Sequence, residues 1–159
     1  MTQLAHEPPR RAVILRGIPG AGKSTLAAEL ARESGLAREA CVFSTDRLFD
    51  ELHGGEFSAL LLNRLHQINL TRFIHAAARH MPLIVCDNTN TEPWEYSAYE
   101  AAARAMGYAI EVRVVGAPWN QAEVELCATR NLRRVPAEIV RAMAARLVES
   151  LQQTNSHAR

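Results

Sequence analysis

The chain has 159 residues, of which 48% are hydrophobic and 22% are charged, and its formal net charge at pH 7 is +1. This length and balance predict one globular domain with a substantial core. The small net charge argues against a surface that follows many phosphates of a nucleic acid, and leaves open a local basic patch. The three cysteines are widely spaced and outside any CxxC pattern, which argues against a disulfide framework and against a zinc site.

Membrane association is not indicated by the sequence. No stretch of about 18 consecutive apolar residues occurs. The first residues also lack an apolar segment of signal-peptide length. The sequence therefore predicts a cytoplasmic protein that does not contact a membrane.

Short apolar strands and helical segments are predicted to alternate from the start of the chain. Residues 1–11 are expected to form a flexible leader, followed by a strand at residues 12–16. A helical pattern runs from 22 to 34, where Gly35 is suited to end a helix. A second strand is predicted at residues 40–45.

The second half of the chain continues this alternation. Residues 57–80 place Leu61, Leu65 and Ile68 at helical spacing, which predicts an amphipathic helix. The later predicted elements are a strand at 83–87, a helix from Thr91 to Met106, a strand at 109–115, a helix at 120–130, a helix from Pro136 to about Leu151, and a polar tail at 152–159. Strands separated by helices favour a parallel sheet covered on both faces.

The segment GIPGAGKS follows the first predicted strand and matches G-x-x-x-x-G-K-[ST]. A strand before this motif and a helix after it are the context in which it forms a phosphate-binding loop. Glycines let backbone N–H groups converge on phosphate oxygens, and the helix N-terminus adds a positive dipole end. The residues predicted to bind the nucleotide are Gly17, Pro19, Gly20, Ala21, Gly22, Lys23, Ser24 and Thr25.

Lys23 is the only lysine in the chain. Its ammonium group is a compact charge that can follow the terminal phosphates of a nucleotide, whereas a guanidinium is bulkier. The Ser24 hydroxyl is expected to bind Mg²⁺. No guanine-binding N-K-x-D signature follows a later strand, so ATP is the predicted nucleotide. The motif and the alternation together predict the α/β fold of P-loop NTPases, a three-layer α/β/α sandwich with a four-stranded parallel sheet.

Two of the three aspartates are predicted to end strands. Asp46 ends the second strand and Asp87 the third, so both are expected at the sheet edge that carries the phosphate loop. A carboxylate there can hold Mg²⁺, or it can orient an acceptor hydroxyl and take its proton. The structural alternatives are that Asp46 caps a helical turn and that Asp87 is a strand-end acceptor. The third aspartate, Asp50, is expected to be solvated surface.

A basic cluster, TRNLRRVP, lies between two predicted helices at residues 129–136. A guanidinium brought over the phosphates stabilises the charge that spreads onto them during phosphoryl transfer. Arg130, Arg133 and Arg134 are therefore candidates for a helical lid at about 129–140 that closes on ATP and excludes water. The alternative is a solvated basic turn.

The phosphate loop, the STD ending at Asp46, the DNTN beginning at Asp87 and the RNLRRVP stretch resemble the P-loop kinase domain of the polynucleotide 5′-hydroxyl kinase group. That group includes single-domain ATP-binding relatives of the AAA and zeta-toxin-like kind. The resemblance covers nearly the whole predicted domain, residues 12–151. It implies an ATP- and Mg²⁺-dependent kinase with a helical lid.

The resemblance also implies roles for individual residues. Asp46 corresponds to the general base that accepts the proton of a 5′-hydroxyl. The residues with implied catalytic roles are Lys23, Asp46, Arg130, Arg133 and Arg134. The residues implied at the acceptor are Asp46, Arg47, Asp87 and Asn90, and Ser24 and Asp87 are the expected Mg²⁺ ligands.

The leading functional prediction is a phosphotransferase that moves the γ-phosphoryl group of ATP to a 5′-hydroxyl of a nucleic acid. Phage-type members of the group carry a basic residue shortly after the aspartate, where this chain has Phe49. The sequence therefore leaves the acceptor open. The alternatives are a kinase for a nucleoside, sugar or antibiotic, and an ATP-binding module that hydrolyses ATP weakly.

Overall fold

The computed structural model describes residues 8–157, so most of the predicted leader lies outside the described part of the chain. A sheet of four parallel strands in the order β2-β3-β1-β4 forms its centre. The strands are β1 (Arg11–Arg16), β2 (Val42–Phe43), β3 (Leu83–Asp87) and β4 (Ala109–Val114). The predicted four-stranded parallel sheet is confirmed.

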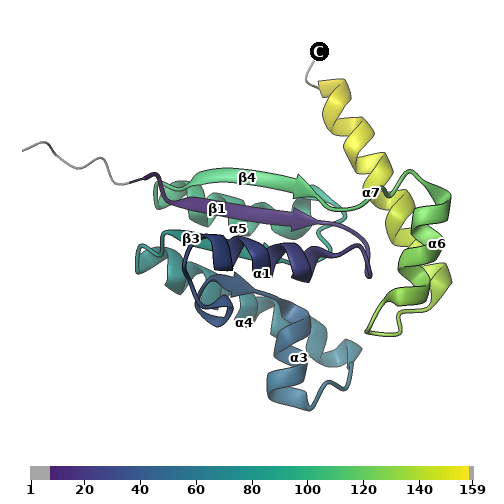
Figure 1. The fold of residues 1–159 in the computed structure, drawn as a ribbon, viewed down its shortest axis with the longest axis horizontal. Coiled ribbons are helices and arrows are strands. Elements are labelled where there is room, and N and C mark those ends of the chain that lie inside the picture. Colours follow the sequence, from purple (N-terminus) through teal and green to yellow (C-terminus); the bar gives the residue numbers. More distant parts are fainter. Residues whose placement is uncertain (1–7, 158–159) are drawn as a thin grey trace, which may run out of the picture.

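Helices cover both faces of this sheet, as the sequence predicted. The helices of the described chain are α1 (Lys23–Glu33), α2 (Arg38–Cys41), α3 (Thr45–His53), α4 (Ala59–Ala78), α5 (Pro93–Ala105), α6 (Gln121–Arg130) and α7 (Ala137–His157). Helix α1 lies on one face, α4 and α5 lie on the other, and α6 packs beyond the carboxyl ends of the strands (Figure 1). The sheet is therefore the middle layer of three.

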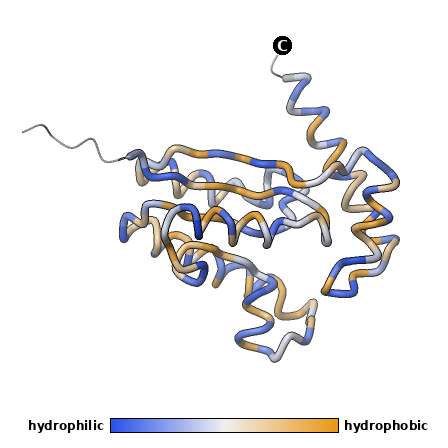
Figure 2. Tube along the Cα trace, in the orientation of Figure 1, coloured by the Kyte–Doolittle hydropathy of each residue, from blue (hydrophilic) through white to orange (hydrophobic). Residues whose placement is uncertain are grey.

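The two faces of β1 explain why residues 12–15, between the arginines at its two ends, are all apolar. Ala12 and Ile14 point into a core formed with α4 and α5. Val13 and Leu15 point into a second core formed with α1. A strand that is buried on both faces needs apolar side chains at every position, not at alternate ones. Figure 2 shows the resulting hydrophobic stretch along β1.

The outer strand β4 differs because one of its faces is not covered. Glu111 and Arg113 alternate with apolar residues, and Glu111 is 3.1 Å from the guanidinium of Arg11 on β1. Ile110 packs against the core on the opposite face. The edge strand therefore has the alternation of a half-exposed strand.

The second predicted strand, residues 40–45, is mostly wrong. Only Val42 and Phe43 pair with β3. Residues 38–41 form the short helix α2, and the strand is followed at once by the unpredicted helix α3. The N-cap of α3 is Ser44, whose hydroxyl accepts a hydrogen bond from the Arg47 N–H at 3.4 Å. Asp46 therefore neither ends the strand nor caps the helix, and lies in the first turn of α3.

Two other helix boundaries differ from the prediction. Helix α5 is capped by Glu92 and not by Thr91, because Glu92 and Glu95 bond each other's backbone in a capping box. Helix α7 does not end near Leu151 but continues to His157, so most of the predicted polar tail is helical.

The three cysteines lie in the hydrophobic cores. Cys41, Cys86 and Cys127 are free and buried. Burial raises the pKa of Cys86 to about 12, so its thiol stays protonated inside the core. Among the helices of residues 8–157, none combines the length and the apolar character needed to cross a bilayer.

Candidate active site

Residues 17–22, here called the phosphate loop, connect β1 to the start of α1. Gly20 and Gly22 have φ angles of 81° and 96°, which non-glycine residues rarely adopt. A Cβ on Gly20 would overlap the carbonyl oxygen of Cys127, whereas a Cβ on Gly22 would meet no atom within 4 Å. Helix α6, which carries Cys127, therefore supports the phosphate loop through direct backbone contact.

The two glycines give a matched test of this contact. We expect Gly20→Ala to destabilise the fold and to weaken ATP binding more than Gly22→Ala. Both substitutions strain the backbone by roughly 1–2 kcal/mol, but only the first forces α6 and the loop apart. Urea denaturation and ATP titration of both variants measure the difference. Equal losses in both would show that the contact with α6 is unimportant.

Lys23 lies at the start of α1 with only 9% of its surface exposed. Its Nζ donates a hydrogen bond to the Ile18 carbonyl at 3.1 Å. Burial lowers the pKa of Lys23, and the charges of Asp87 and then Asp46 oppose this shift. The ammonium group therefore lies near two carboxylates at the sheet edge. A bound phosphate would bring further negative charge and would stabilise the protonated form of this buried lysine.

Asp87 ends β3 and is 4% exposed. The Ser24 hydroxyl donates a hydrogen bond to its Oδ2 at 2.9 Å. Burial raises the pKa of Asp87, while Lys23 and the Ser24 hydrogen bond lower it. A hydroxyl beside a buried carboxylate is an oxygen donor set that suits Mg²⁺ completed by water and nucleotide oxygens. The residues present therefore fit this ion.

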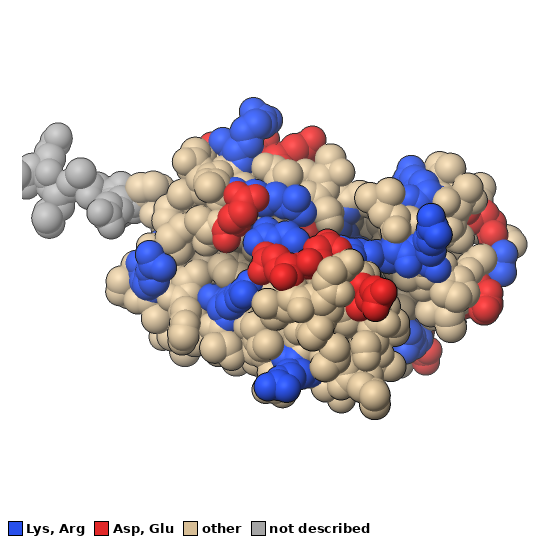
Figure 3. All heavy atoms as spheres, turned by 90° about the horizontal axis from the view of Figure 1, so that it is seen from below, with Lys and Arg blue, Asp and Glu red and all other residues tan. Residues whose placement is uncertain are grey.

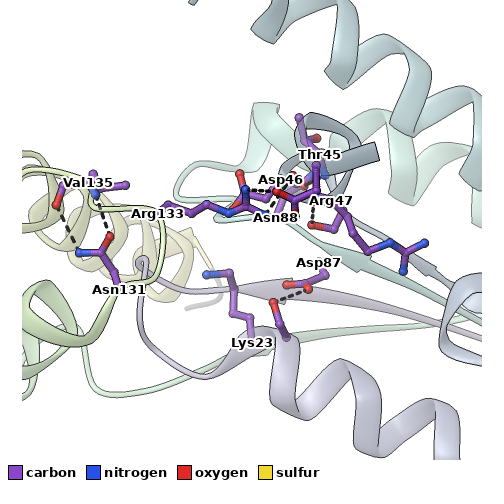
Figure 4. Close-up of polar contacts among 12 residues, drawn as sticks. Lys23, Thr45, Asp46, Arg47, Asp87, Asn88, Asn131, Arg133 and Val135 are labelled. Atoms are coloured by element: carbon purple, nitrogen blue, oxygen red, sulfur yellow. Dashed lines mark hydrogen bonds and ion pairs between the residues drawn. The ribbon is translucent and has the colours of Figure 1, made fainter. Parts of the chain in front are cut away.

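Asp46 extends from the first turn of α3, and 66% of its side chain is exposed. Thr45, immediately before it, is buried and is held by two hydrogen bonds. Its N–H donates to Asn88 Oδ1 at 3.0 Å, and its Oγ1 is 3.0 Å from Nδ1 of His66. Figure 4 shows Asp46 with Asp87 and Lys23 around one space at the carboxyl edge of the sheet. The carboxylate is thus fixed at its backbone and accessible at its side chain.

The basic turn, residues 131–136 between α6 and α7, is ordered by its own side chains. Asn131 Nδ2 donates to the carbonyl of Ala128 at 2.7 Å, and its Oδ1 accepts from the Val135 N–H at 2.7 Å. Arg134 has a φ of 53°, and its side chain is exposed. The turn therefore has a defined shape even where its side chains are solvated.

Two of the three candidate lid arginines contact the site. Arg130 Nε donates to the Gly20 carbonyl at 2.6 Å, in the phosphate loop. Arg133 makes two hydrogen bonds to Asp50, at 2.8 and 2.6 Å, and one to the Asp46 carbonyl at 3.1 Å. Figure 4 shows Arg133 reaching from the basic turn to α3. Asp50 is exposed, as predicted, and it also binds Arg133, which lies 83 residues away in the sequence.

We expect Asp50→Asn to loosen the basic turn without unfolding the protein. Loss of an exposed ion pair of this kind should accelerate amide exchange at residues 131–136 by roughly two- to five-fold. Hydrogen exchange followed by mass spectrometry measures this. Glu51→Gln is the matched control, because Glu51 lies on the same helix but pairs with Arg72 at 2.8 Å. Equal exchange in wild type and Asp50→Asn would contradict the role of this ion pair.

The remaining predicted acceptor residues lie apart from this space. Arg47 Nε is 3.4 Å from Glu51, and its side chain extends away from Lys23 (Figure 4). Asn90 is 2% exposed, has a φ of 47°, and donates to the Leu15 carbonyl at 2.8 Å. Asn90 thus joins the segment after β3 to the end of β1.

Arg16 is a positioning residue that the sequence analysis did not single out. It is 3% exposed and donates to the carbonyls of Asn90 and Thr91, each at 2.8 Å, and to the Ser150 hydroxyl at 2.8 Å. Its guanidinium also lies 5.1 Å from the ring centroid of Tyr96. A charged residue at the end of an otherwise apolar strand, directly before the phosphate loop, was the available signal.

Charge on the surface is mixed in sign. Figure 3 shows basic and acidic side chains lying next to each other on the face seen from below the view of Figure 1. No group of three or more His, Cys, Asp or Glu residues within the described ranges could hold a metal ion. A divalent cation at Ser24 and Asp87 would therefore take its other ligands from solvent and substrate.

Known proteins share both the sequence and the fold. The AAA_33 family, an AAA domain, matches residues 13–152. NEDD4-binding protein 2 from Homo sapiens is 32% identical over 131 residues, which are 82% of this chain and 7% of that protein. This chain thus spans a small part of that relative.

Solved structures give the corresponding result for the fold. A chain in the Pnkp1/Rnl/Hen1 RNA repair complex matches with a TM-score of 0.70 and 16% identity, over 96% of this chain and 49% of that one. The APS kinase CysC of Mycobacterium tuberculosis, in complex with AMPPNP and APS, matches more weakly, with a TM-score of 0.46, 21% identity, and coverage of 67% and 62%. The expected P-loop α/β fold and the resemblance to the polynucleotide kinase group are confirmed, and the chain belongs to the AAA_33 family of AAA domains.

Proposed function

We propose that this domain is an ATP- and Mg²⁺-dependent phosphotransferase that transfers the γ-phosphoryl group of ATP to an acceptor hydroxyl. One observation carries the proposal. A buried lysine, a hydroxyl–carboxylate pair and an accessible carboxylate converge at the carboxyl edge of one parallel sheet. This is the edge where open α/β sheets bind their ligands.

The phosphate loop and the start of α1 bind the triphosphate. Backbone N–H groups of the loop and the positive end of the α1 dipole attract the phosphate oxygens. Lys23 contacts the terminal phosphates, and Thr25 adds a hydroxyl in the first turn of α1. Arg130, which is bonded to the carbonyl of Gly20, stabilises charge on the transferred group in this proposal, and its contact with the phosphate loop supports that role.

Ser24 and Asp87 would hold Mg²⁺. The ion supplies charge neutralisation between the phosphate oxygens when it is bound. The hydrogen bond between Ser24 and Asp87 keeps both oxygens together before the ion arrives. Asp87 is nearly buried, so its ligand oxygen is already largely removed from water.

Asp46 acts as the general base. It accepts the proton of the acceptor hydroxyl as the acceptor oxygen forms a bond to the γ-phosphorus. The bond between the γ-phosphorus and the β,γ-bridging oxygen breaks, and ADP leaves with that electron pair. The accessibility of Asp46 favours this role, since an acceptor must reach the carboxylate from solvent. The basic turn then forms a lid over the reacting groups, with Arg133 beside Asp46.

The acceptor that we favour is a 5′-hydroxyl end of a nucleic acid. The solved relative in an RNA repair complex directs this choice. The net charge of +1 and the mixed charge on the face in Figure 3 favour binding of a chain end through few phosphates over binding along a chain. A small-molecule alcohol is the second candidate, because the exposed carboxylate of Asp46 by itself does not select a polymer.

An acceptor screen tests the proposal. The protein is incubated with γ-labelled ATP, Mg²⁺ and a 5′-hydroxyl oligonucleotide, and in parallel with a pool of small alcohols. A labelled oligonucleotide supports the favoured acceptor, and a labelled small molecule supports the second candidate. Labelled inorganic phosphate alone, or no release, would leave an ATP-binding module and refute the transferase. A 5′-phosphorylated oligonucleotide is the matched control, because it lacks the accepting hydroxyl.

A further inference from the structure

Helix α3, which carries Asp46, is only weakly attached to the sheet at its first turn. The strand before it, β2, has two residues and pairs on one side with β3. Farther along, α3 packs against α4 through Leu48, Phe49 and Leu65. The first turn, where Asp46 lies, therefore depends on polar contacts for its position.

Arg133 supplies some of these contacts, because it donates to the Asp46 carbonyl at 3.1 Å and its Nε lies 3.9 Å from the Asp46 carboxylate. Thr45 supplies two more, and they come from two different elements. Asn88, after β3, accepts the N–H of Thr45 at 3.0 Å. His66, on α4, lies with its Nδ1 at 3.0 Å from the Thr45 hydroxyl. Thr45 is 3% exposed, so the two bonds replace contacts with water that it cannot make. Together they fix the residue next to Asp46 in both its backbone and its side chain.

The charges around His66 come from two helices besides its own. The residue is exposed overall, but partial desolvation of its ring lowers the pKa of the His66 imidazole, whereas Glu95 on α5 and Asp46 on α3 raise it. The ring therefore lies within electrostatic range of the proposed base. The imidazole can act only by holding Thr45 through Nδ1, or it can also contact the acceptor through Nε2.

Resting on the proposed function, we propose that His66 is a positioning residue for phosphoryl transfer: its Nδ1 bond to Thr45 holds the first turn of α3, and thereby sets the place of the Asp46 carboxylate. His66 need not touch the acceptor for this. A displacement of about 1 Å in a reacting group can lower a rate by about 10²-fold. Loss of the hydrogen bond between His66 and Thr45, one residue before Asp46, can therefore lower the rate of transfer if it lets the carboxylate shift by a comparable distance.

Substitution of His66 by asparagine or by glutamine distinguishes the role of Nδ1 from the role of Nε2. An asparagine amide stands near the position of Nδ1, whereas a glutamine amide stands near the position of Nε2. We expect His66→Ala and His66→Gln to lower kcat by about 10- to 100-fold with an unchanged KM for ATP. We expect His66→Asn to stay within about three-fold of wild type, because it retains a partner for Thr45.

Thr45→Val provides the reciprocal change, since valine keeps the shape and loses the hydroxyl. It should lower kcat as much as His66→Ala, and the double variant should lose no more than either single one. The assay is phosphoryl transfer to the acceptor found in the screen, with thermal unfolding of every variant measured alongside. Asn63→Ala, an exposed position on α4, is the control for substitution of this helix.

The possible results are distinct. Wild-type turnover in His66→Ala would overturn the proposal, and so would restoration by glutamine but not by asparagine, which would assign the role to Nε2. Loss in Thr45→Val that adds fully to loss in His66→Ala would also contradict it. Absence of transfer by the wild-type protein to any acceptor would refute the proposed function, and the inference with it. If His66→Ala does not fold, the comparison of asparagine with glutamine decides.

Discussion

Asp46→Asn should lower phosphoryl-transfer turnover by about 10²- to 10⁴-fold and leave the affinity for ATP near that of wild type. An asparagine amide has the shape of the carboxylate but cannot accept the proton of the acceptor hydroxyl. Asp46 does not cap α3, because Ser44 does, so the substitution removes no cap. Its side chain is mostly exposed, which makes a large loss of stability unexpected. Single-turnover kinetics with saturating ATP and acceptor measure the effect.

Glu33→Gln is the control for this substitution. Glu33 is an exposed carboxylate at the end of α1, far along the helix from the phosphate loop. It should retain wild-type turnover. If Asp46→Asn also retained turnover, Asp46 would be excluded as the general base, and proton removal would have to be assigned to another group or to water.

Lys23→Ala should weaken ATP binding by about 10- to 100-fold, the loss expected for a hydrogen bond to a charged group. Lys23 is buried, so in Lys23→Ala little water can reach the phosphates in place of the lost ammonium group. Lys23→Arg should bind ATP more weakly than wild type as well, because the planar guanidinium needs more room than the loop provides. Isothermal titration with ATP and Mg²⁺ measures both affinities.

Arg32→Ala serves as the matched control, since Arg32 is an exposed cation near the other end of the same helix. Its affinity for ATP should be that of wild type. Circular dichroism should show that Lys23→Ala retains its helices. A folded Lys23→Ala variant with unchanged affinity would remove the phosphate loop from the proposed nucleotide site.

The sheet and the phosphate loop could be predicted because their signals are local. Residues 12–15 of β1 and residues 83–86 of β3 are continuous apolar runs, and the phosphate-binding motif is one unbroken stretch from Gly17 to Ser24. The meeting of Asp87 with Ser24 followed from the general rule that parallel strands end at one edge. No individual contact had to be known for these predictions.

Helix α3 and its contacts could not be predicted in this way. Its nine residues are too few for a periodic pattern to be distinguished from a turn after a strand. The pairing of Arg133 with Asp50 and the bond of Thr45 to His66 join segments that are distant in sequence, and no spacing rule links them. Such contacts depend on where the helices pack, so the sequence indicated the site residues without their partners.

The contact of Gly20 with Cys127 couples the phosphate loop to helix α6. The carbonyl of Gly20 also binds Arg130, and Cys127 and Arg130 both belong to α6. A shift of the loop on phosphate binding would press on α6, and would thereby change the position of Arg133 in the basic turn that follows it. We therefore expect ATP to bind before the acceptor, because ATP binding would adjust the basic turn beside Asp46, where the acceptor binds.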